Sequence, residues 1–482
     1  MSQLVDVAII GAGPAGVVAA LRLQQLGYQV LLLERSQFPR PQIGEAFTPG
    51  IKNILDLLDA HEVLANVAQL AHLPTQIYWQ QRTPELLPAN PGSMIDRAAF
   101  DTAMLALAHN RGVQVRHPAH IDHIRGDAGD WRIQFTDAQG EQYAIANFLL
   151  DAQGRHGNAS TRLACAPALM GIWAEIDPAN LPAAIGSSTL VEACAQGWLW
   201  GNRLPNQTLR LLLCCDPHQL EHKAEAFLRN QCRTSQLFAP LADVPFTSRI
   251  HASAATPYID SASYQTHRFK LGDAAFALDP VSSSGVEKAM RFSINVTIAL
   301  HTLLQDPYKS SGAMVQEFYE QRLVETCARH ALWTRRHYRQ AWCAHLPFWQ
   351  NQTNEYPLGT DALAISLQQE ITRLQNYRPP VTNARAMLSP QHRLRFHPEL
   401  KVVQSLCVID NKVHRHAAFM HPDLERPLAF LDGEEVVKKL NFMASQPTLA
   451  NALDLLGLDM SAQKAQRLLG WFWQHGLLQA IG

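Results

Sequence analysis

The apolar positions at the start of the chain predict a strand, a tight turn, a helix and a second strand. Val5 to Ile10 is an apolar run of strand character, and it passes directly into Gly-Ala-Gly-Pro-Ala-Gly at residues 11–16. A helical pattern from Ala15 to Leu26 follows, and a second apolar strand runs from Gln29 to Leu33. This order of elements is typical of a dinucleotide-binding turn.

The residue types in this turn suit the phosphates and the ribose of a dinucleotide. Gly11 permits the tight turn, Gly13 lets a pyrophosphate approach the backbone, and Gly16 lets the helix pack against the strand. The helix N-terminus at Ala15 then favours negative charge. Glu34 ends the second strand, 23 residues after Gly11, where an acid is placed to accept hydrogen bonds from a ribose diol.

Beyond this unit the pattern predicts a mixed α/β protein. One or two helices are expected within residues 51–70, and another opens near Met94. A strand at 76–79 is expected to leave the cofactor domain. Two groups of strands follow, the first at 113–115, 121–124 and 131–135 and closed by residues 148–155, and the second at 170–176, 188–192, 197–200 and 209–215. A long helix is predicted to end near Leu304, and a helical, aromatic region follows it until Pro379-Pro380.

The last part of the chain predicts a separate unit. Lys401 to Ile409 and Val413 to Met420 are expected to form a hairpin across Asp410-Asn411. Gly476 is predicted to cap the last helix. Three short helices are expected, at 434–443, 448–456 and 461–475.

Composition narrows the class of protein and its surroundings. The 482 residues and a hydrophobic fraction of 47% fit two or three folded domains. The formal charge of −1 gives no basic field for nucleic acid or an anionic membrane, so neither is an expected partner. The 8 cysteines show neither zinc spacing nor a disulfide framework, and no metal is expected. Because neither a basic n-region at the start nor an apolar stretch of ~18 residues is present, we expect a cytoplasmic protein.

Two segments after the first turn resemble known flavoproteins. Residues 34–45, Glu-Arg-Ser-Gln-Phe-Pro-Arg-Pro-Gln-Ile-Gly-Glu, resemble the segment after the second strand in flavin-dependent halogenases and geranylgeranyl-reductase-like flavoproteins. Residues 97–101, Arg-Ala-Ala-Phe-Asp, resemble the helix of these families whose arginine lies near FAD; a salt bridge at the helix start is the alternative for this arginine. The FAD contacts that the resemblance implies are Glu34, Arg35, Ile43, Glu45 and Arg97.

A second motif lies at residues 269–289. Gly272-Asp273-Ala274-Ala275 and the loop at 279–286 resemble the G-D-A-A…D-P…G-x-G element of the same families, whose aspartate meets the ribityl chain and whose loop lies along the isoalloxazine. Small residues and a proline permit close approach to a flat ring, and the following helix N-terminus stabilises an anionic reduced flavin. The implied contacts are Asp273, Pro280, Ser284, Gly285 and Val286.

The resemblance extends over about residues 1–305 and implies a domain organisation. The implied fold is α/β, with a Rossmann-like FAD-binding domain of the aromatic hydroxylase and halogenase type, an interleaved β-sheet domain that covers the flavin, and a C-terminal helical part. The predicted ranges are 1–70, 94–165 and 265–305 for the FAD-binding domain, 71–93 and 166–264 for the β-sheet domain, 306–394 for a helical region, and 395–482 for a small winged-helix-like domain.

The same resemblance implies oxygen chemistry. Reduced FAD reacts with molecular oxygen to give a C4a-hydroperoxide, which can hydroxylate an electron-rich ring. Halogenases divert this intermediate through a lysine on the strand after the first long helix, and the corresponding residues 72–79 contain no lysine. We therefore expect oxygenation rather than halogenation. The catalytic base is not identified: His72, His251 and Glu45 are each more typical of structural residues.

Residues 279–289 look most like the flavoproteins that mature cysteine tryptophylquinone, including that of quinohemoprotein amine dehydrogenase. This resemblance implies an FAD-dependent monooxygenase that hydroxylates tryptophan within a peptide or protein, with the C-terminal unit recognising the substrate. A halogenase or small-molecule hydroxylase is the alternative in the same class, and a non-catalytic flavin-containing assembly factor is the alternative from another class. Because the chain has one dinucleotide turn, NAD(P)H is expected to reduce FAD in the flavin cleft or through a partner reductase.

Overall fold

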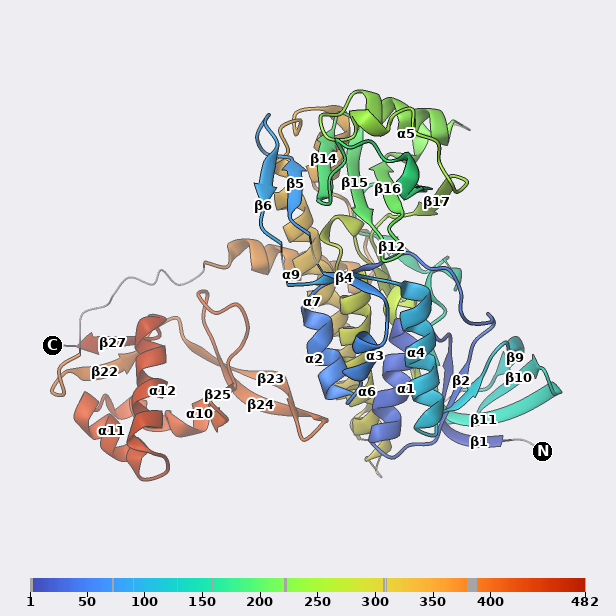
Figure 1. Cartoon of the computed structure of the whole chain (residues 1–482). Coiled ribbons are helices and arrows are strands. Elements are labelled where there is room, and N and C mark those ends of the chain that lie inside the picture. Colours follow the sequence, from blue (N-terminus) through green and yellow to red (C-terminus); the bar gives the residue numbers. More distant parts are fainter. Residues whose placement is uncertain are drawn as a thin grey trace. The chain divides into compact units, whose positions relative to one another are not determined.

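The computed structural model describes residues 3–71, 73–89, 91–127, 129–157, 159–220, 223–306, 308, 310–378 and 388–481. The chain divides into two compact units, of which the first comprises Met1–His301 and Tyr319–Gln368 and the second Thr302–Phe318 and Gln369–Gly482 (Figure 1).

The first unit is built on a mainly parallel sheet whose central strand is β1. Strand β1 (Gln3–Ile10) lies between β2 (Val30–Leu33) and β11 (Gly140–Asp151), and it is parallel to both. Apolar side chains fill both faces of these strands, as expected for a parallel sheet covered on both sides. The other strands of this sheet are β8 (Gln114–Arg116), β9 (His120–Arg125), β10 (Trp131–Asp137), β19 (Tyr264–Gln265) and β20 (Arg268–Lys270).

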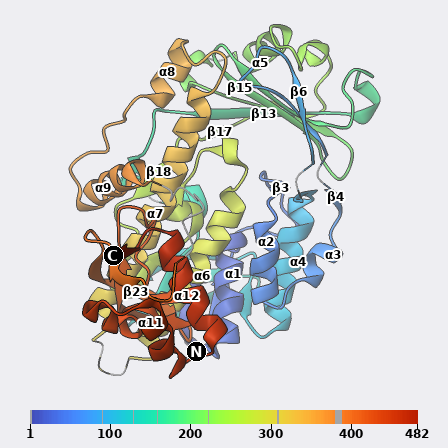
Figure 2. The same cartoon turned by 90° about the vertical axis from the view of Figure 1, so that its left-hand side faces the viewer.

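Helices cover this sheet. Helix α1 (Pro14–Gln25) follows β1 directly and packs against β2 and against α4 (Arg97–Asn110). Figures 1 and 2 show α1, α2 and α4 side by side, and α6 (Gly285–Leu304) lies beside α1. The turn between β1 and α1 lies at the carboxyl end of β1, next to the carboxyl end of β11.

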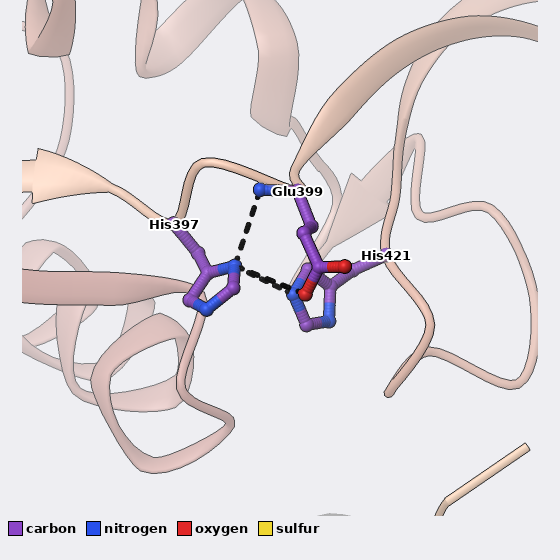
Figure 3. A group of neighbouring side chains, drawn as sticks. All are labelled: His397, Glu399 and His421. Carbon is purple, nitrogen blue, oxygen red and sulfur yellow. Dashed lines mark hydrogen bonds and ion pairs between the residues drawn. The ribbon is translucent and has the colours of Figure 1, made fainter.

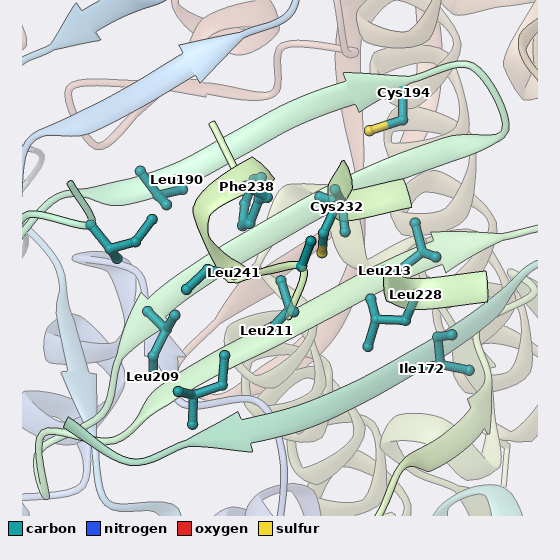
Figure 4. Packing of buried hydrophobic residues seen from close by; sticks show 14 of the residues in the cluster. Ile172, Leu190, Cys194, Leu209, Leu211, Leu213, Leu228, Cys232, Phe238 and Leu241 are labelled. Atoms are coloured by element: carbon teal, nitrogen blue, oxygen red, sulfur yellow. The ribbon is translucent and has the colours of Figure 1, made fainter. Parts of the chain in front are cut away.

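A second sheet of the first unit is buried on both faces. Helix α5 (Ala224–Arg233) covers one face, where Leu209, Leu211 and Leu213 pack (Figures 1, 2 and 4). The intervening residues Leu212 and Cys214 point to the opposite face, which carries an aromatic cluster. In spatial order the strands are β17 (His251–Ala254), β13 (Met170–Ile176), β16 (Leu209–Cys215), β15 (Gly197–Arg203), β14 (Thr189–Cys194), β5 (Thr75–Tyr78) and β6 (Glu85–Leu87).

The aromatic cluster on that opposite face joins the sheet to the helices that follow in the chain. It contains Trp79, Trp198, Tyr338 and Trp349, all nearly inaccessible to solvent. Trp349 Nε1 donates to the Cys194 carbonyl at 2.8 Å, which fixes the indole against β14. The helices concerned are α7 (Gly312–Arg339) and α8 (Pro347–Thr353), and α9 (Ala362–Asn376) follows them.

Smaller elements complete the first unit. Where a helical pattern up to Leu70 is expected, the structure has α2 (Gly50–Leu57), α3 (Glu62–Ala65) and then the strand β4 (Gln69–Ala71). Asp59 adopts a φ of 51° after α2, which ends the first helix. Short strands pair as β3 (Ala46–Phe47), β7 (Ser93–Ile95) and β4, and as β12 (Arg162–Ala164), β18 (Tyr258–Asp260) and β21 (Phe276–Ala277).

The second unit has its own core. Strands β23 (Lys401–Ile409) and β24 (Lys412–Met420) form the predicted hairpin, and the turn residues Asp410 and Asn411 both have positive φ, as a type I′ turn requires. Leu394, Phe419 and Phe472 lie in its core. The remaining elements are β22 (Arg393–Phe396) paired with β27 (Leu478–Ile481), α11 (Leu449–Gly457) and α12 (Ala462–Gln474).

The helix expected at 434–443 is wrong in extent. Strand β26 (Glu434–Glu435) pairs with β25 (Phe430–Leu431) across Asp432-Gly433, where both residues have positive φ, and α10 (Val436–Lys439) is one turn long. Pro379-Pro380 lies outside the described residues. Across the part of the chain that the structure describes, no helix combines the length and apolarity needed to cross a membrane.

Candidate functional site

The turn between β1 and α1 is held by backbone contacts that leave no room for side chains. A Cβ at Gly11 would lie 2.4 Å from the Ala152 carbonyl oxygen, and a Cβ at Gly16 would lie 2.0 Å from the Gly11 carbonyl oxygen. Gly11 also has a φ of 103°, which other residues rarely adopt. These two glycines are therefore required by packing, and they set the turn against the end of β11.

Gly13 differs from its neighbours because its surroundings are open. The nearest atom to a Cβ placed there is Arg40 Nη2, at 3.8 Å. The N-cap of α1 is Gly13, which has no side chain to cap the first turn, so the backbone N–H groups of that turn can meet an anion. Ala15, in the first turn of α1, is buried. The space beside Gly13 is where a pyrophosphate is expected.

Glu34 points back at this turn. Its Oε2 accepts from the Ala12 amide at 2.9 Å and its Oε1 from the Ser36 amide at 2.8 Å, and the residue is 6% exposed. The carboxylate therefore stabilises the turn itself, in addition to any ribose contact. Arg40 lies 3.9 Å from it, and Arg35 is exposed.

The loop at 43–45 meets Arg97 and the start of α6. Arg97 Nη1 donates to the Ile43 carbonyl at 2.8 Å and to the Gly44 carbonyl at 3.1 Å. A Cβ at Gly44 would lie 2.9 Å from Arg97 Nη1 and 3.4 Å from a methyl group of Val286. Three segments that are far apart in sequence are thus brought together here.

Arg97 serves the fold as well as this loop. It is 4% exposed, and it forms an ion pair with Asp101 at 3.1 Å. This is the salt bridge at the helix start that was the alternative role of this arginine. Arg97 therefore forms this salt bridge and also contacts the loop that is predicted to lie beside FAD.

Glu45 is held in a buried ion pair. Arg210 Nη1 lies 2.6 Å from Glu45 Oε1, and Arg210 Nη2 lies 2.5 Å from Glu175 Oε1. Because Arg210 belongs to β16, this pair ties the loop before β3 to the second sheet. A carboxylate engaged in this way is a structural anchor rather than a free base.

The motif at Gly272-Asp273 packs on the dinucleotide helix. A Cβ at Gly272 would lie 2.9 Å from the Ala15 Cβ and 3.4 Å from the Ala289 Cβ. The Asp273 side chain is 43% exposed and pairs with Arg155 at 2.9 Å. Asp273 therefore lies beside α1, with part of its carboxylate open to a ligand.

Hydrogen bonds hold the start of the loop at 280–285, whereas the backbone at its end is exposed. Asp279 Oδ1 accepts from the Val281 amide at 2.9 Å, which fixes Pro280, and Ser283 has a φ of 49°. Ser284 Oγ lies 2.8 Å from Ser282 Oγ. Gly285 is exposed, and a Cβ there would meet nothing within 4 Å. The open side gives room for a flat ring close to the backbone.

Asp279 is the end of a fully buried chain of hydrogen bonds. Trp198 Nε1 donates to the Tyr338 hydroxyl at 2.9 Å, and this hydroxyl donates to Asp279 Oδ2 at 2.8 Å. Burial raises the pKa of Asp279 to about 6, although the Val281 amide and Tyr338 favour its charged form. The chain connects the second sheet and α7 to the loop at 280–285.

A cavity of about 20 Å³ borders Asp279, which is room for about one water molecule. His330 and Thr334, one turn apart on α7, line it, and within the described residues His330 Nε2 and Thr334 Oγ1 have no hydrogen-bond partner. Burial lowers the pKa of His330 to about 4, so its ring is neutral at pH 7. The cavity is therefore suited to a polar molecule of the size of water.

Of the other two candidate bases, the structure describes His251. His251 stacks on Trp173 with ring centroids 5.3 Å apart, in keeping with a structural residue. His72 lies outside the described residues. Thr75 and Gln76, where a relay lysine would be sought, begin β5.

Sequence reasoning missed Arg210, Tyr338 and His330. Arg210 is a charged residue in the otherwise apolar run 209–215, and this interruption is a recognisable sign of a buried ion pair. Tyr338 and His330 lie in a helical region rich in aromatic residues, where nothing local separates them from ordinary core residues.

This turn, acid and pair of loops lie within an FAD-binding fold of the hydroxylase and halogenase type. The chain belongs to the FAD binding domain family, whose sequence profile matches residues 4–312. The fold predicted from the sequence is confirmed.

Three known proteins are similar to it. Tryptophan 2-halogenase from Chondromyces crocatus is 26% identical over 338 residues, which are 65% of this chain and 63% of the halogenase. The structure of the peptidyl tryptophan dihydroxylase QhpG, essential for tryptophylquinone cofactor biogenesis, has a TM-score of 0.75 at 22% identity over 98% of this chain and 100% of QhpG. CmlS, a flavin-dependent halogenase, has a TM-score of 0.72 at 18% identity over 100% of this chain and 96% of CmlS.

The residues present fit FAD. The space beside Gly13 is open, the first turn of α1 is uncapped by side chains, and the backbone at Gly285 is accessible. The individual FAD contacts named from the sequence stay predictions.

Gly13→Val is expected to abolish FAD binding while the chain still folds. The added side chain occupies the space that the pyrophosphate needs, but no protein atom lies within 3.4 Å of its Cβ position. The measurement is FAD affinity, by titration of the apo-protein, together with its unfolding temperature. Gly16→Ala gives the contrast, because its Cβ would lie 2.0 Å from the Gly11 carbonyl oxygen, so it should lower the unfolding temperature as well as the FAD affinity. Wild-type FAD affinity in Gly13→Val would contradict the assignment.

Asp279→Asn is expected to change how stability depends on pH. The pKa of Asp279 is raised from its ordinary value of 3.8 to about 6, so the folded first unit retains this proton when the unfolded chain has lost it. Stability from this group is therefore present at low pH and is lost as pH rises through about 6, by on the order of 3 kcal/mol. Thermal unfolding from pH 4 to 7 should show this fall in wild type and not in the variant. Equal pH dependence of the unfolding temperature in wild type and Asp279→Asn would refute this expectation. Asp177→Asn, at a partly exposed N-cap, is the control for the loss of one charge.

Proposed function

We propose that the protein is an FAD-dependent monooxygenase that hydroxylates a tryptophan side chain within a polypeptide during biogenesis of a quinone cofactor. The observation that carries this proposal is the whole-chain likeness to QhpG, which extends over the flavin unit and the second unit alike. The resemblance of residues 279–289 to flavoproteins of tryptophylquinone maturation supports the same substrate class.

The chain's own residues would bind and orient FAD. The turn at Gly13 and the α1 N-terminus would hold the pyrophosphate, Glu34 the ribose, and Asp273 the ribityl chain. The loop from Pro280 to Val286 would lie along the ring. When bound and reduced, FAD supplies the electrons that activate molecular oxygen for transfer to an aromatic ring. NAD(P)H would provide those electrons directly or through a partner reductase.

The buried chain from Trp198 through Tyr338 to Asp279 would keep the loop at 280–285 in one conformation. Its members are at most 2% exposed, so water does not compete for these hydrogen bonds. A fixed loop would place the ring reproducibly against the substrate, and such positioning supports catalysis.

Halogenation is the second candidate, favoured by the halogenase relatives. Residues 72–79 hold no lysine to relay a halogen, and the described residues 75–78 form β5, an interior strand of the second sheet. This favours direct transfer of oxygen to the substrate.

The second unit is the proposed site of substrate recognition. Among the described strands, β23 pairs only with β24, so its outer edge can accept a further strand from an extended peptide. Val402 and Val408 on β23 are 58% and 44% exposed. Binding energy gained there, away from the reacting ring, would orient the target tryptophan.

The product is expected to carry oxygen from molecular oxygen, with a yield independent of chloride and bromide. The missing lysine motivates this expectation. Mass spectrometry of a tryptophan-containing polypeptide after incubation with enzyme, reductant and isotopically labelled oxygen measures it. A mass gain that requires halide would instead establish the halogenase, and a wild type without bound FAD or any product would defeat the enzyme assignment.

Removing the chain after Arg378 is expected to preserve FAD binding and to weaken binding of the polypeptide substrate far more than reaction with free indole. A cut at Arg395 is unsuitable because it falls within β22, which pairs with β27. FAD content and unfolding temperature check that the first unit remains folded. Val402→Asp in the full chain is the milder variant, and it should also weaken binding of the polypeptide substrate. Full affinity in both variants would exclude the recognition role.

A further inference from the structure

Three possible metal ligands meet at the base of the β23–β24 hairpin in the second unit. His397 follows β22, Glu399 precedes β23, and His421 follows β24 (Figure 3). The ligand atoms of the three side chains all lie within 4.8 Å of one another. They come from two stretches of chain that the hairpin brings together.

The two imidazoles face each other directly. His397 Nδ1 and His421 Nε2 are 2.9 Å apart, and the ring planes are nearly perpendicular, at 89°. Glu399 Oε2 lies 3.9 Å from the same His397 Nδ1 (Figure 3). One carboxylate and two ring nitrogens therefore converge on one point.

The single lone pair of His397 Nδ1 is approached by two donors in the absence of metal. The Glu399 amide lies 3.2 Å from it, and the His421 Nε2 proton is directed at it. The Asp423 amide donates to His421 Nδ1 at 3.1 Å, which leaves the proton of the neutral ring on Nε2. A cation at the convergence point would take the place of that proton.

A carboxylate lies near the second ring nitrogen of His421. Asp423 Oδ2 lies 3.6 Å from His421 Nδ1, on the side away from His397. A carboxylate on the second ring nitrogen is the usual outer partner of a ligating histidine. His421 is buried, whereas the Glu399 side chain is 65% exposed. The cluster is thus anchored on one side and open on the other, where a cation and a water ligand can enter.

We propose that His397, Glu399 and His421 bind a zinc ion. Two imidazoles and a carboxylate are a zinc ligand set, and water would complete a tetrahedron. Zn–N bonds of about 2.0–2.1 Å require the two nitrogens to separate by a few tenths of an ångström. On binding, His421 changes tautomer: its proton moves from Nε2 to Nδ1, where the N–H turns from the Asp423 amide to the Asp423 carboxylate, so no proton is lost. The ion would join β22 to both strands of the hairpin and stabilise the second unit.

The test uses the full chain, freed of metal with a chelator and titrated with zinc chloride by calorimetry. We expect one saturable site per chain, a higher unfolding temperature of the second unit, and visible absorption of tetrahedral cobalt when cobalt replaces zinc. Glu399→Gln and His397→Asn should each weaken zinc binding at least roughly tenfold, and Asp423→Asn by about tenfold.

His414→Asn is the matched control, because His414 lies on β24 outside the cluster, and its zinc affinity should equal that of wild type. Glu399 is exposed, so Glu399→Gln should leave the fold intact and keep the result interpretable if His397→Asn unfolds. The absence of a saturable site in wild type, or equal zinc affinity in wild type and Glu399→Gln, would overturn the proposal.

Discussion

The close contact of three backbone segments at Gly11, Gly16 and Ala152 is the constraint on which the flavin unit depends. A side chain at either glycine would overlap a carbonyl oxygen, so the first turn can lie against the end of β11 only with glycine at both positions. This contact sets where α1 begins, and Glu34 then closes the turn from the neighbouring strand through the Ala12 amide. Gly272 packs on the same helix at Ala15, so the second flavin motif depends on the same crossing.

Two buried polar connections link two loops near the predicted FAD site to the second sheet of the first unit. The ion pair of Glu45 with Arg210 holds the loop after residue 43, and the chain from Trp198 to Asp279 holds the loop at 280–285. Leaving one partner of a buried polar pair unmatched costs more than the pair contributes, so both loops are kept in one arrangement. The position of the predicted FAD ring would therefore depend on the second sheet.

The second unit is organised by different forces. An apolar core around Phe472 holds its helices, and the hairpin extends with exposed valines on β23. The proposed zinc ion and the proposed peptide contact would both act on this hairpin, one at its base and the other along its edge. If both hold, metal binding would stabilise the element that recognises the substrate, and the affinity for polypeptide would depend on zinc.

The sequence by itself determined the features that depend on local pattern. The strand, turn and helix from Val5 to Leu26, the hairpin at Asp410-Asn411 and the fold class followed from periodicity, turn residues and family motifs. Only the tertiary structure decided which distant side chains meet, as Tyr338 meets Asp279 and His421 meets His397. The physical reason is that such contacts depend on strand register and helix packing, whereas turns and caps are fixed by their own few residues. The prediction of a helix over 434–443 was wrong in extent for the same reason, because residues 434–435 pair with β25 instead of continuing the local helical pattern.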